Sequence, residues 1–384
     1  MLRIKFIAVV VCLTFLVAPA QENDIQQKLE SRLNEVFTKA GYPGVTAALA
    51  LPDGRVLTAA AGWADRDHRI PLKPSDRMYA GSVGKMFVSA VILKTVEDGT
   101  LDLDSKIERW VGREPWFGRL PNARQLTLRL LLSHRSGIED YHTNSRAFWK
   151  AITDSPSKTW APLELASYAF DKKPSSSAGT KYSYSDMNYI IAGLVFETAT
   201  GRKLFAEVDR RILKPLHLDL TTPIEGHTLD NLARGQISPK NPIGVKGETI
   251  QEGRELIAFQ AEYAGGGLIS NSGDLARWAK SLFEGDVLSK RQLAEMLKGL
   301  PADKDGKYGL GVGIDSSEAG PVYGHDGWTI GYQTSLAYFR DYKIAAAIQV
   351  NSDPNPAFKI TLDTCLGRVA GTYLADKLPK KESR

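Results

Sequence analysis

Apolar and polar positions follow different periods along the chain, and these periods divide it into three parts. Near the N-terminus, apolar residues recur every three or four positions, which predicts an amphipathic helix over residues 24–40. Two short apolar segments, 45–51 and 55–60, flank Pro52-Asp53-Gly54 and predict a β-hairpin. Strand-like segments return only near the C-terminus, ahead of a last helix over about 356–374. These segments are 309–314, 334–339 and 343–350.

The middle of the chain has helical spacing instead, separated by polar loops. The segments that carry it are 126–133, 162–171, 187–199 and 204–213. Strands at both ends with helices between them predict an α/β fold whose first lobe is assembled from the two termini. We place that lobe at about 22–105 and 256–384, and an inserted helical lobe at about 106–255. Small-molecule sites commonly lie in such a cleft between lobes.

The first twenty residues predict an export signal. Arg3 and Lys5 precede an almost wholly apolar run over 6–17, and Ala18-Pro19-Ala20 supplies the small residues that a signal peptidase reads. The run is too short for the roughly 20 residues that span a bilayer. We therefore expect residues 1–20 to be a signal peptide and residues 21–384 to be one periplasmic or secreted catalytic domain, with no stable membrane span. A retained anchor is the alternative.

Composition and charge narrow the function classes. The 384 residues are 43% hydrophobic and 24% charged, which is ordinary for a folded protein with a sizeable core. Removing residues 1–20 takes away two positive charges, so the net charge falls from +5 to +3. So small a value argues against a nucleic-acid-binding surface. The mature chain keeps one cysteine, Cys365, which excludes an internal disulfide.

The first motif with chemical meaning is Gly81-Ser82-Val83-Gly84-Lys85. Apolar residues at helical spacing follow it, so Ser82 is predicted at a helix start with Lys85 one turn later on the same side. A serine hydroxyl becomes a good nucleophile when a neighbouring amine takes its proton. The alternative is a helix cap beside a solvated lysine. A second Ser-x-x-Lys, at Ser155 and Lys158, shows how easily four residues match, but no long apolar helix follows it.

Two further motifs contain groups that can take part in acyl transfer from a serine. Tyr184-Ser185-Asp186 stands just before a predicted helix, and a tyrosine there can relay a proton, although a partly buried aromatic residue is the commoner role. His325-Asp326-Gly327-Trp328 precedes a predicted strand. Glycine lets a backbone approach a substrate closely, and a backbone N–H could complete an oxyanion hole with that of Ser82. The alternative is a strand-edge turn with a surface histidine.

Taken together, the three motifs resemble the serine β-lactamase and penicillin-binding protein family, in its class C β-lactamase, DD-peptidase and family VIII esterase branch. The order and wide separation of the motifs carry the resemblance, which covers about residues 25–375. Three linking segments support it: Leu131-Leu132-Ser133-His134-Arg135-Ser136-Gly137, Gly265-Gly266-Gly267-Leu268-Ile269-Ser270 and Tyr308-Gly309-Leu310-Gly311.

The resemblance implies a β-lactamase/transpeptidase-like fold with a central antiparallel sheet flanked by helices. It implies an acyl-enzyme mechanism in which Ser82 attacks while Lys85 and Tyr184 handle the proton. The backbone amides of Ser82 and Trp328 would hold the oxyanion, and His325 would line the pocket beside Tyr184. The sequence leaves open which of Lys85 and Tyr184 is the base.

Two departures from the family pattern bear on the substrate. The family's Tyr-x-Asn is here Tyr-x-Asp, with Asp186 in place of the amide that meets the substrate's acyl group. The family's Lys-Thr-Gly or His-x-Gly is here His-Asp-Gly. A histidine at the first position is known among the family's peptidases and esterases, but Asp326 stands where a threonine hydroxyl meets a substrate carboxylate. We therefore expect small esters or uncharged amides to be better substrates than β-lactams.

Other functions stay open or are set aside at this point. A β-lactamase, a D-alanyl-D-alanine carboxypeptidase and a non-catalytic penicillin-binding or acyl-binding protein are the alternatives. The chain lacks Gly-x-Ser-x-Gly and His-Glu-x-x-His, and a phosphate-loop pattern fails around Lys85 because Tyr79 stands at its first glycine. We predict no metal or other cofactor, no nucleic-acid partner, and a small ester, amide, D-peptide or β-lactam as substrate.

Overall fold

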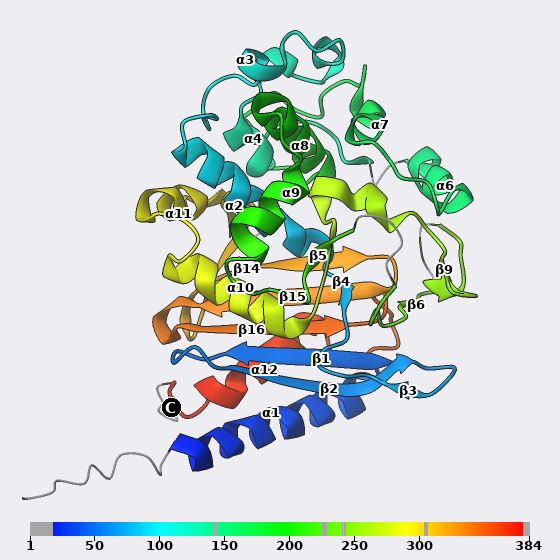
Figure 1. The fold of residues 1–384 in the computed structure, drawn as a ribbon, viewed down its shortest axis with the longest axis vertical. Helices are drawn as coiled ribbons and strands as arrows, with labels where there is room; N and C mark the ends of the chain where they lie inside the picture. The colour runs from blue at the N-terminus through cyan, green and yellow to red at the C-terminus, as the bar shows by residue number, and fades with distance from the viewer. Residues whose placement is uncertain are drawn as a thin grey trace, which may run out of the picture.

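A nine-stranded antiparallel sheet forms the centre of the computed structural model, which describes residues 18–141, 145–224, 229–239, 241, 243–302 and 306–378 (Figure 1). The strand order is β11-β12-β13-β14-β15-β16-β1-β2-β3. The strands are β1 Gly44–Ala50, β2 Val56–Asp65, β3 Ile70–Pro71, β11 Leu300–Pro301, β12 Lys307–Tyr308, β13 Gly313–Ser317, β14 Gly320–Thr329, β15 Tyr332–Phe339 and β16 Ile344–Val350.

The two ends of the chain meet at the pairing of β1 with β16. Val45 lies opposite Val350, and every residue of both strands is buried. Successive residues of a strand point to opposite faces, so Ala47 and Leu49 enter one hydrophobic core while Ala48 and Ala50 enter the other. A strand that is apolar on both faces needs helices on both, and the sheet is therefore a central layer. The predicted fold class is confirmed.

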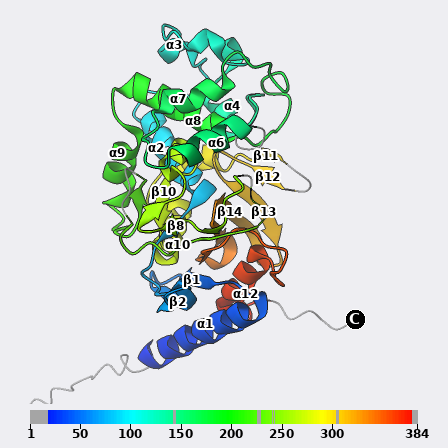
Figure 2. The ribbon, with the colours of Figure 1, turned by 90° about the vertical axis from the view of Figure 1, so that its right-hand side faces the viewer.

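Helices cover both faces of the sheet. Helices α1 (Ala18–Ala40) and α12 (Leu362–Leu374) lie against one face, and α10 (Ser272–Glu284) packs on the other (Figures 1 and 2). Leu29 and Leu33 of α1 share a core with Cys365 of α12. Cys365 is a buried apolar neighbour in this core, as its place in the predicted last helix indicates.

The remaining helices gather beyond α10, with α3, α4, α7 and α8 at the end of the molecule farthest from α1 (Figure 1). They are α2 Gly84–Glu97, α3 Glu108–Val111, α4 Leu128–Leu132, α6 Arg146–Asp154, α7 Pro162–Ala166, α8 Asp186–Thr200, α9 Leu204–Val208 and α11 Lys290–Met296. Short strands complete the fold: β4 Met78–Tyr79, β5 Thr222–Pro223, β6 Gln236–Ile237, β7 Gly247–Glu248, β8 Ile250–Gln251, β9 Arg254–Glu255 and β10 Leu268–Ser270. The lobe boundaries given above stay a prediction.

Several element predictions need correction. The segment 309–314 is not one strand, because β12 ends at Tyr308 and β13 begins at Gly313. The last helix begins at Leu362 rather than near residue 356, since the Thr361 side chain caps it by accepting the backbone N–H of Thr364. The ten-residue strand β14 was not expected at all, and it carries the His-Asp-Gly motif.

The N-terminal segment bears on the predicted signal peptide. Residues 1–17 lie outside the described residues, and α1 begins at Ala18, earlier than the predicted residue 24. The predicted cleavage point after Ala20 therefore falls in its first turn. Within the described ranges, no helix has both the length and the apolar content needed to cross a bilayer.

Candidate active site

Ser82 lies in a short 3₁₀ turn, Gly81–Val83, that leads directly into α2. Gly81 has a φ of 54°, and a Cβ there would lie 2.6 Å from the backbone nitrogen of Trp328. A Cβ on Gly327 would lie 2.0 Å from the carbonyl oxygen of Ala80. Two glycines therefore allow β14 to pack directly on the serine turn, with the backbones of Ser82 and Trp328 side by side.

Lys85 is fully buried one turn after Ser82. Its Nζ donates to the Ser82 Oγ at 2.8 Å, and also contacts the Gly265 carbonyl and the Asp186 carboxylate. A buried ammonium needs partners of this kind, because burial without them costs several kcal/mol. The alternative of a solvated lysine is therefore wrong. Asp186 pairs with Lys85 and also lines the cavity that contains Ser82.

Tyr184 lies at the start of α8, beside Ser82 and Lys85. The Lys85 Nζ is 5.0 Å from the centre of its ring. Burial of the hydroxyl and the nearby Asp186 carboxylate raise the pKa of Tyr184 well above its usual range, although a hydrogen bond with Ser82 opposes them. The side chain as a whole is 36% exposed. Tyr184 is therefore a neutral phenol near pH 7 that faces both Ser82 and the open cavity.

The ring of His134 packs against the ring of Tyr184. Its ring lies 4.2 Å from that of Tyr184, centre to centre. Its Nδ1 accepts the backbone N–H of Ser185 and the side-chain amide of Asn188, each at 3.2 Å. Burial and the Lys85 charge lower the pKa of His134 well below its usual range, so this imidazole is neutral. His134 therefore fixes the backbone that leads into α8.

β14 presents an open edge to the site. β13 pairs with β14 only as far as Gly324, so within the described ranges residues 325–329 pair on one side alone, with β15. His325 lies opposite Leu336 and Asp326 opposite Ser335. Because neighbouring residues of a strand alternate, these two side chains point to opposite faces. His325 faces α2, and Asp326 faces α12.

The two side chains have different electrostatic surroundings. Burial and the Lys85 charge lower the pKa of His325 to about 4, so it is neutral near pH 7. Asp326 is exposed along the cavity, but the protein groups around its carboxylate displace part of its water. This desolvation raises the pKa of Asp326 to about 6, and Asp363 and Asp315 add to this, while a hydrogen bond from Ser335 opposes it. The Ser335 Oγ donates to the Asp326 Oδ1 at 2.6 Å.

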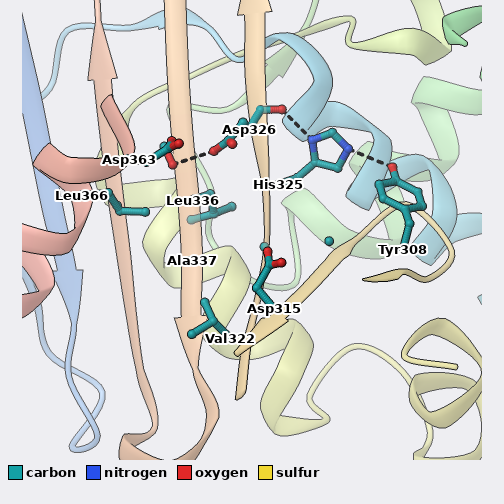
Figure 3. Close-up of a pocket in the computed structure, with 12 residues that line it drawn as sticks. Tyr308, Asp315, Val322, His325, Asp326, Leu336, Ala337, Asp363 and Leu366 are labelled. Atoms are coloured by element: carbon teal, nitrogen blue, oxygen red, sulfur yellow. Dashed lines mark hydrogen bonds between the residues drawn. The ribbon is translucent and has the colours of Figure 1, made fainter. Parts of the chain in front are cut away.

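The predicted site residues come together. A cavity of about 550 Å³ is lined by Ser82, Tyr184, Asp186, His325, Asp326, Gly327 and Trp328, with Lys85 buried beneath it. A second cavity of about 440 Å³ shares His325, Asp326 and Asp363 with the first and extends to Asp315 (Figure 3). Neither set of lining residues contains a lysine or an arginine.

Several residues of the site were not assigned a role from the sequence. Tyr308 bonds to His325, and Asp363 of α12 lines both cavities. Asp353 accepts the indole N–H of Trp328 at 3.1 Å and the backbone N–H of Gly331 at 2.7 Å. Only Tyr308 had a signal, in the linking segment that it opens. Across the described ranges, no group of three or more His, Cys, Asp or Glu side chains could hold a metal ion.

Curated relatives and solved structures are similar to this chain over most of its length. Penicillin-binding protein 4* of Bacillus subtilis is 23% identical over 73% of this chain and 62% of its own length. Protein flp of Staphylococcus aureus is 27% identical over 52% of this chain and 38% of its own. The chain thus spans less than two thirds of either relative.

Solved structures match more completely. A D-stereospecific amidohydrolase from Streptomyces is 27% identical with a TM-score of 0.74, covering 92% of this chain and 98% of that one. A D-amino acid amidase from Ochrobactrum anthropi is 25% identical with a TM-score of 0.77, covering 93% and 99%. The model of the family described as Beta-lactamase matches residues 23–364. This chain therefore belongs to the Beta-lactamase family.

Proposed function

We propose that this chain is an exported serine hydrolase that forms an acyl-enzyme through Ser82 on small esters or amides. The observation that carries the proposal is the 2.8 Å contact between the Lys85 Nζ and the Ser82 Oγ, made at the floor of an open cavity. A nucleophile needs an adjacent group that accepts its proton, and a neighbour that orients that group. Asp186 and the Gly265 carbonyl orient Lys85 here.

The proposed reaction has two halves. The reactive form of the pair holds Lys85 as an unprotonated amine and Tyr184 as a phenol. The Ser82 Oγ attacks the carbonyl carbon, and its proton passes to the Lys85 Nζ, directly or through the Tyr184 hydroxyl. The oxyanion is held by the backbone N–H groups of Ser82 and Trp328, each such donor being worth about 2.7–4 kcal/mol. The bond to the leaving group then breaks, and the same pair returns the proton to that group. Water attacks the acyl-enzyme by the same route and releases the acid.

Charge in the cavity supports substrates without a carboxylate. Asp326 and Asp363 line the same cavity as Ser82, and the lining residues supply no lysine or arginine to bind a carboxylate. The similarity to a D-amino acid amidase and a D-stereospecific amidohydrolase favours amides among the possible substrates. The similarity to penicillin-binding proteins keeps β-lactamase or D-alanyl-D-alanine carboxypeptidase activity as a second candidate.

The proposal extends to the whole chain. Residues 21–384 form one catalytic domain after loss of residues 1–20, with the active site in the cleft between the predicted lobes. Export to the periplasm or beyond rests on the N-terminal pattern of two basic residues, an apolar run and Ala18-Pro19-Ala20.

The test is a panel of chromogenic esters, D-amino acid amides, D-alanyl peptides and β-lactams, with a fluorophosphonate probe alongside. We expect turnover of an ester or amide, and a label on Ser82 that is lost in Ser82→Ala without a change in the thermal melt. Ser155 is the internal control, since it has the same Ser-x-x-Lys spacing outside the cavity. A label on Ser155 would overturn the site. Labelling of Ser82 without turnover of any substrate would indicate an acyl-binding protein.

A further inference from the structure

The imidazole of His325 makes two hydrogen bonds within the chain, one from each ring nitrogen (Figure 3). Its Nε2 lies 2.8 Å from the hydroxyl of Tyr308 in β12. Its Nδ1 lies 2.5 Å from the backbone carbonyl oxygen of Asp326. The Tyr308 side chain is itself buried, with 6% of its surface exposed. Both polar atoms of the ring are thus occupied before any substrate arrives.

These partners determine where the proton of the ring lies. A carbonyl oxygen only accepts hydrogen bonds, so the Nδ1 must carry a hydrogen. In a neutral imidazole the Nε2 is then an acceptor, and the Tyr308 hydroxyl donates to it. Burial raises the pKa of Tyr308 well above its usual range, which keeps this phenol a donor. These two hydrogen bonds fit a neutral imidazole. In an imidazolium both ring nitrogens carry hydrogen, so the Nε2 could no longer accept the hydrogen bond that Tyr308 donates.

The charged groups around His325 are consistent with a neutral imidazole ring. The titratable groups that face it come from α2, the loop after α4, the start of α8, β12, β14 and α12. They are Lys85, His134, Tyr184, Asp186, Tyr308, Asp326 and Asp363. Lys85 is the one lysine or arginine among these seven, and it is paired with Asp186.

We propose that Tyr308 is a positioning residue that holds His325 as the neutral Nδ1–H tautomer, with its Nε2 turned to β12. The open edge of β14 then presents a neutral ring, where the lysine of the family's Lys-Thr-Gly branch would present a cation. This deepens the proposed function and rests on it for the consequence, which is poor binding of carboxylate-bearing substrates. The tautomer itself does not depend on that function.

The first test is independent of activity. In wild-type protein labelled with ¹⁵N-histidine, we expect His325 to show a protonated Nδ1 and an unprotonated Nε2. Tyr308→Phe removes one hydrogen bond to the neutral ring and should raise the pKa of His325 by about one unit. Tyr323→Phe is the matched control, because Tyr323 is a tyrosine of β14 that lies outside both cavities. A protonated Nε2 in wild type, or an unchanged pKa in Tyr308→Phe, would overturn the proposal.

The second test asks whether Tyr308 acts through His325. We expect Tyr308→Phe, assayed below the raised pKa, to increase kcat/KM for a carboxylate-bearing substrate relative to an uncharged ester by about twofold to fivefold. That change should vanish in a His325→Ala background. A change of equal size in both backgrounds would mean that Tyr308 acts only by packing. Absence of all turnover in wild type would count against the proposed function and leave the tautomer result standing.

Discussion

Tyr184 and Tyr182 are two residues apart and meet different surroundings. Tyr184 contacts Ser82 and the Lys85 ammonium, whereas Tyr182 packs with its ring 6.0 Å from that of His134 and 5.7 Å from that of Tyr308. Both rings are part of one aromatic cluster. The difference between them is that one hydroxyl lies at the nucleophile.

Replacing each of these tyrosines by phenylalanine separates proton transfer from packing. We expect Tyr184→Phe to lower kcat for a p-nitrophenyl ester by about 10²–10⁴, the usual contribution of a general acid–base group. Tyr182→Phe should cost far less. Steady-state kinetics on both variants, with melting curves to confirm folding, give the comparison. If Tyr184→Phe kept more than about a tenth of wild-type turnover, the relay would have to belong to Lys85 alone.

The sequence motifs predict the nucleophile and its neighbouring lysine. They do not predict the residues elsewhere in the chain that hold the site in place. Ser82 and Lys85 are three positions apart, in the 3₁₀ turn and the first turn of α2 that follows it, so local geometry alone brings them together. His134 supports Ser185 from 51 positions away, and Asp353 holds the Trp328 indole from 25 positions away. Such partners are joined only by the tertiary fold. Nothing in their local sequence distinguishes them from other buried polar residues.

At the scale of elements, the site depends on the contact between β14 and the serine turn. Gly327→Ala should push β14 away from that turn, because the new Cβ would meet the Ala80 carbonyl oxygen at 2.0 Å. We expect loss of most ester turnover, since the two proposed oxyanion donors would separate. Gly367→Ala in α12 is the control: nothing lies within 4 Å of its Cβ, and a helical Gly-to-Ala change stabilises by about 0.5–1 kcal/mol. Equal activity in both variants would contradict this role for the contact.

β14 also shows why an element at an active site escapes sequence analysis. It contains Gly320, Gly324 and Gly327, and its solvent exposure alternates only over its last four residues, since residues 320–325 are all half-buried. A strand is recognised by alternating or continuous apolar residues. Here close approach to the serine turn requires glycine, and the substrate cavity requires polar side chains. The neighbouring strands β15 and β16 are almost wholly buried, and their apolar residues predict both of them.

The polar face of β14 leads to a prediction about substrate charge. Asp326 lines the cavity with Ser82, and its pKa of about 6 makes it an anion above that pH and neutral below it. Repulsion of a carboxylate-bearing cephalosporin should therefore be strongest above pH 6 and fade as the pH falls through 6. A residual repulsion of about 1.4 kcal/mol corresponds to a tenfold loss in efficiency. Asp326→Thr should recover that loss at pH 7 and gain little at pH 5.

The measurement compares kcat/KM for a short-chain p-nitrophenyl ester and a chromogenic cephalosporin, in wild type and Asp326→Thr. The ester serves as the control, because it carries no carboxylate. Wild-type efficiency on the cephalosporin above about 10⁴ M⁻¹s⁻¹ would contradict the ester preference. An Asp326→Thr variant with no gain on the cephalosporin would show that the charge of Asp326 is not the cause.

At the scale of the whole molecule, the two ends of the chain close the sheet around β1. Helix α1 takes part in this closure, because Leu29, Leu33 and Val36 are fully buried against the core shared with α12. Burying one such side chain stabilises a fold by about 1.5–3 kcal/mol, and a whole domain is stable by only about 5–15 kcal/mol. Loss of α1 is therefore comparable to the entire stability. The predicted signal peptide, residues 1–20, overlaps the first turn of this helix, which begins at Ala18.

Processing after Ala20 should consequently leave the fold intact. A chain that begins at Gln21 keeps every residue of α1 whose burial the structure describes, so its melting temperature should match that of the chain that retains residues 1–20. A chain that begins at Gly41 lacks the helix and should show no cooperative melt. Intact-mass measurement of exported material should find Gln21 as the first residue. A mass that retains residues 1–20 would mean that the apolar run 6–17 serves as an anchor.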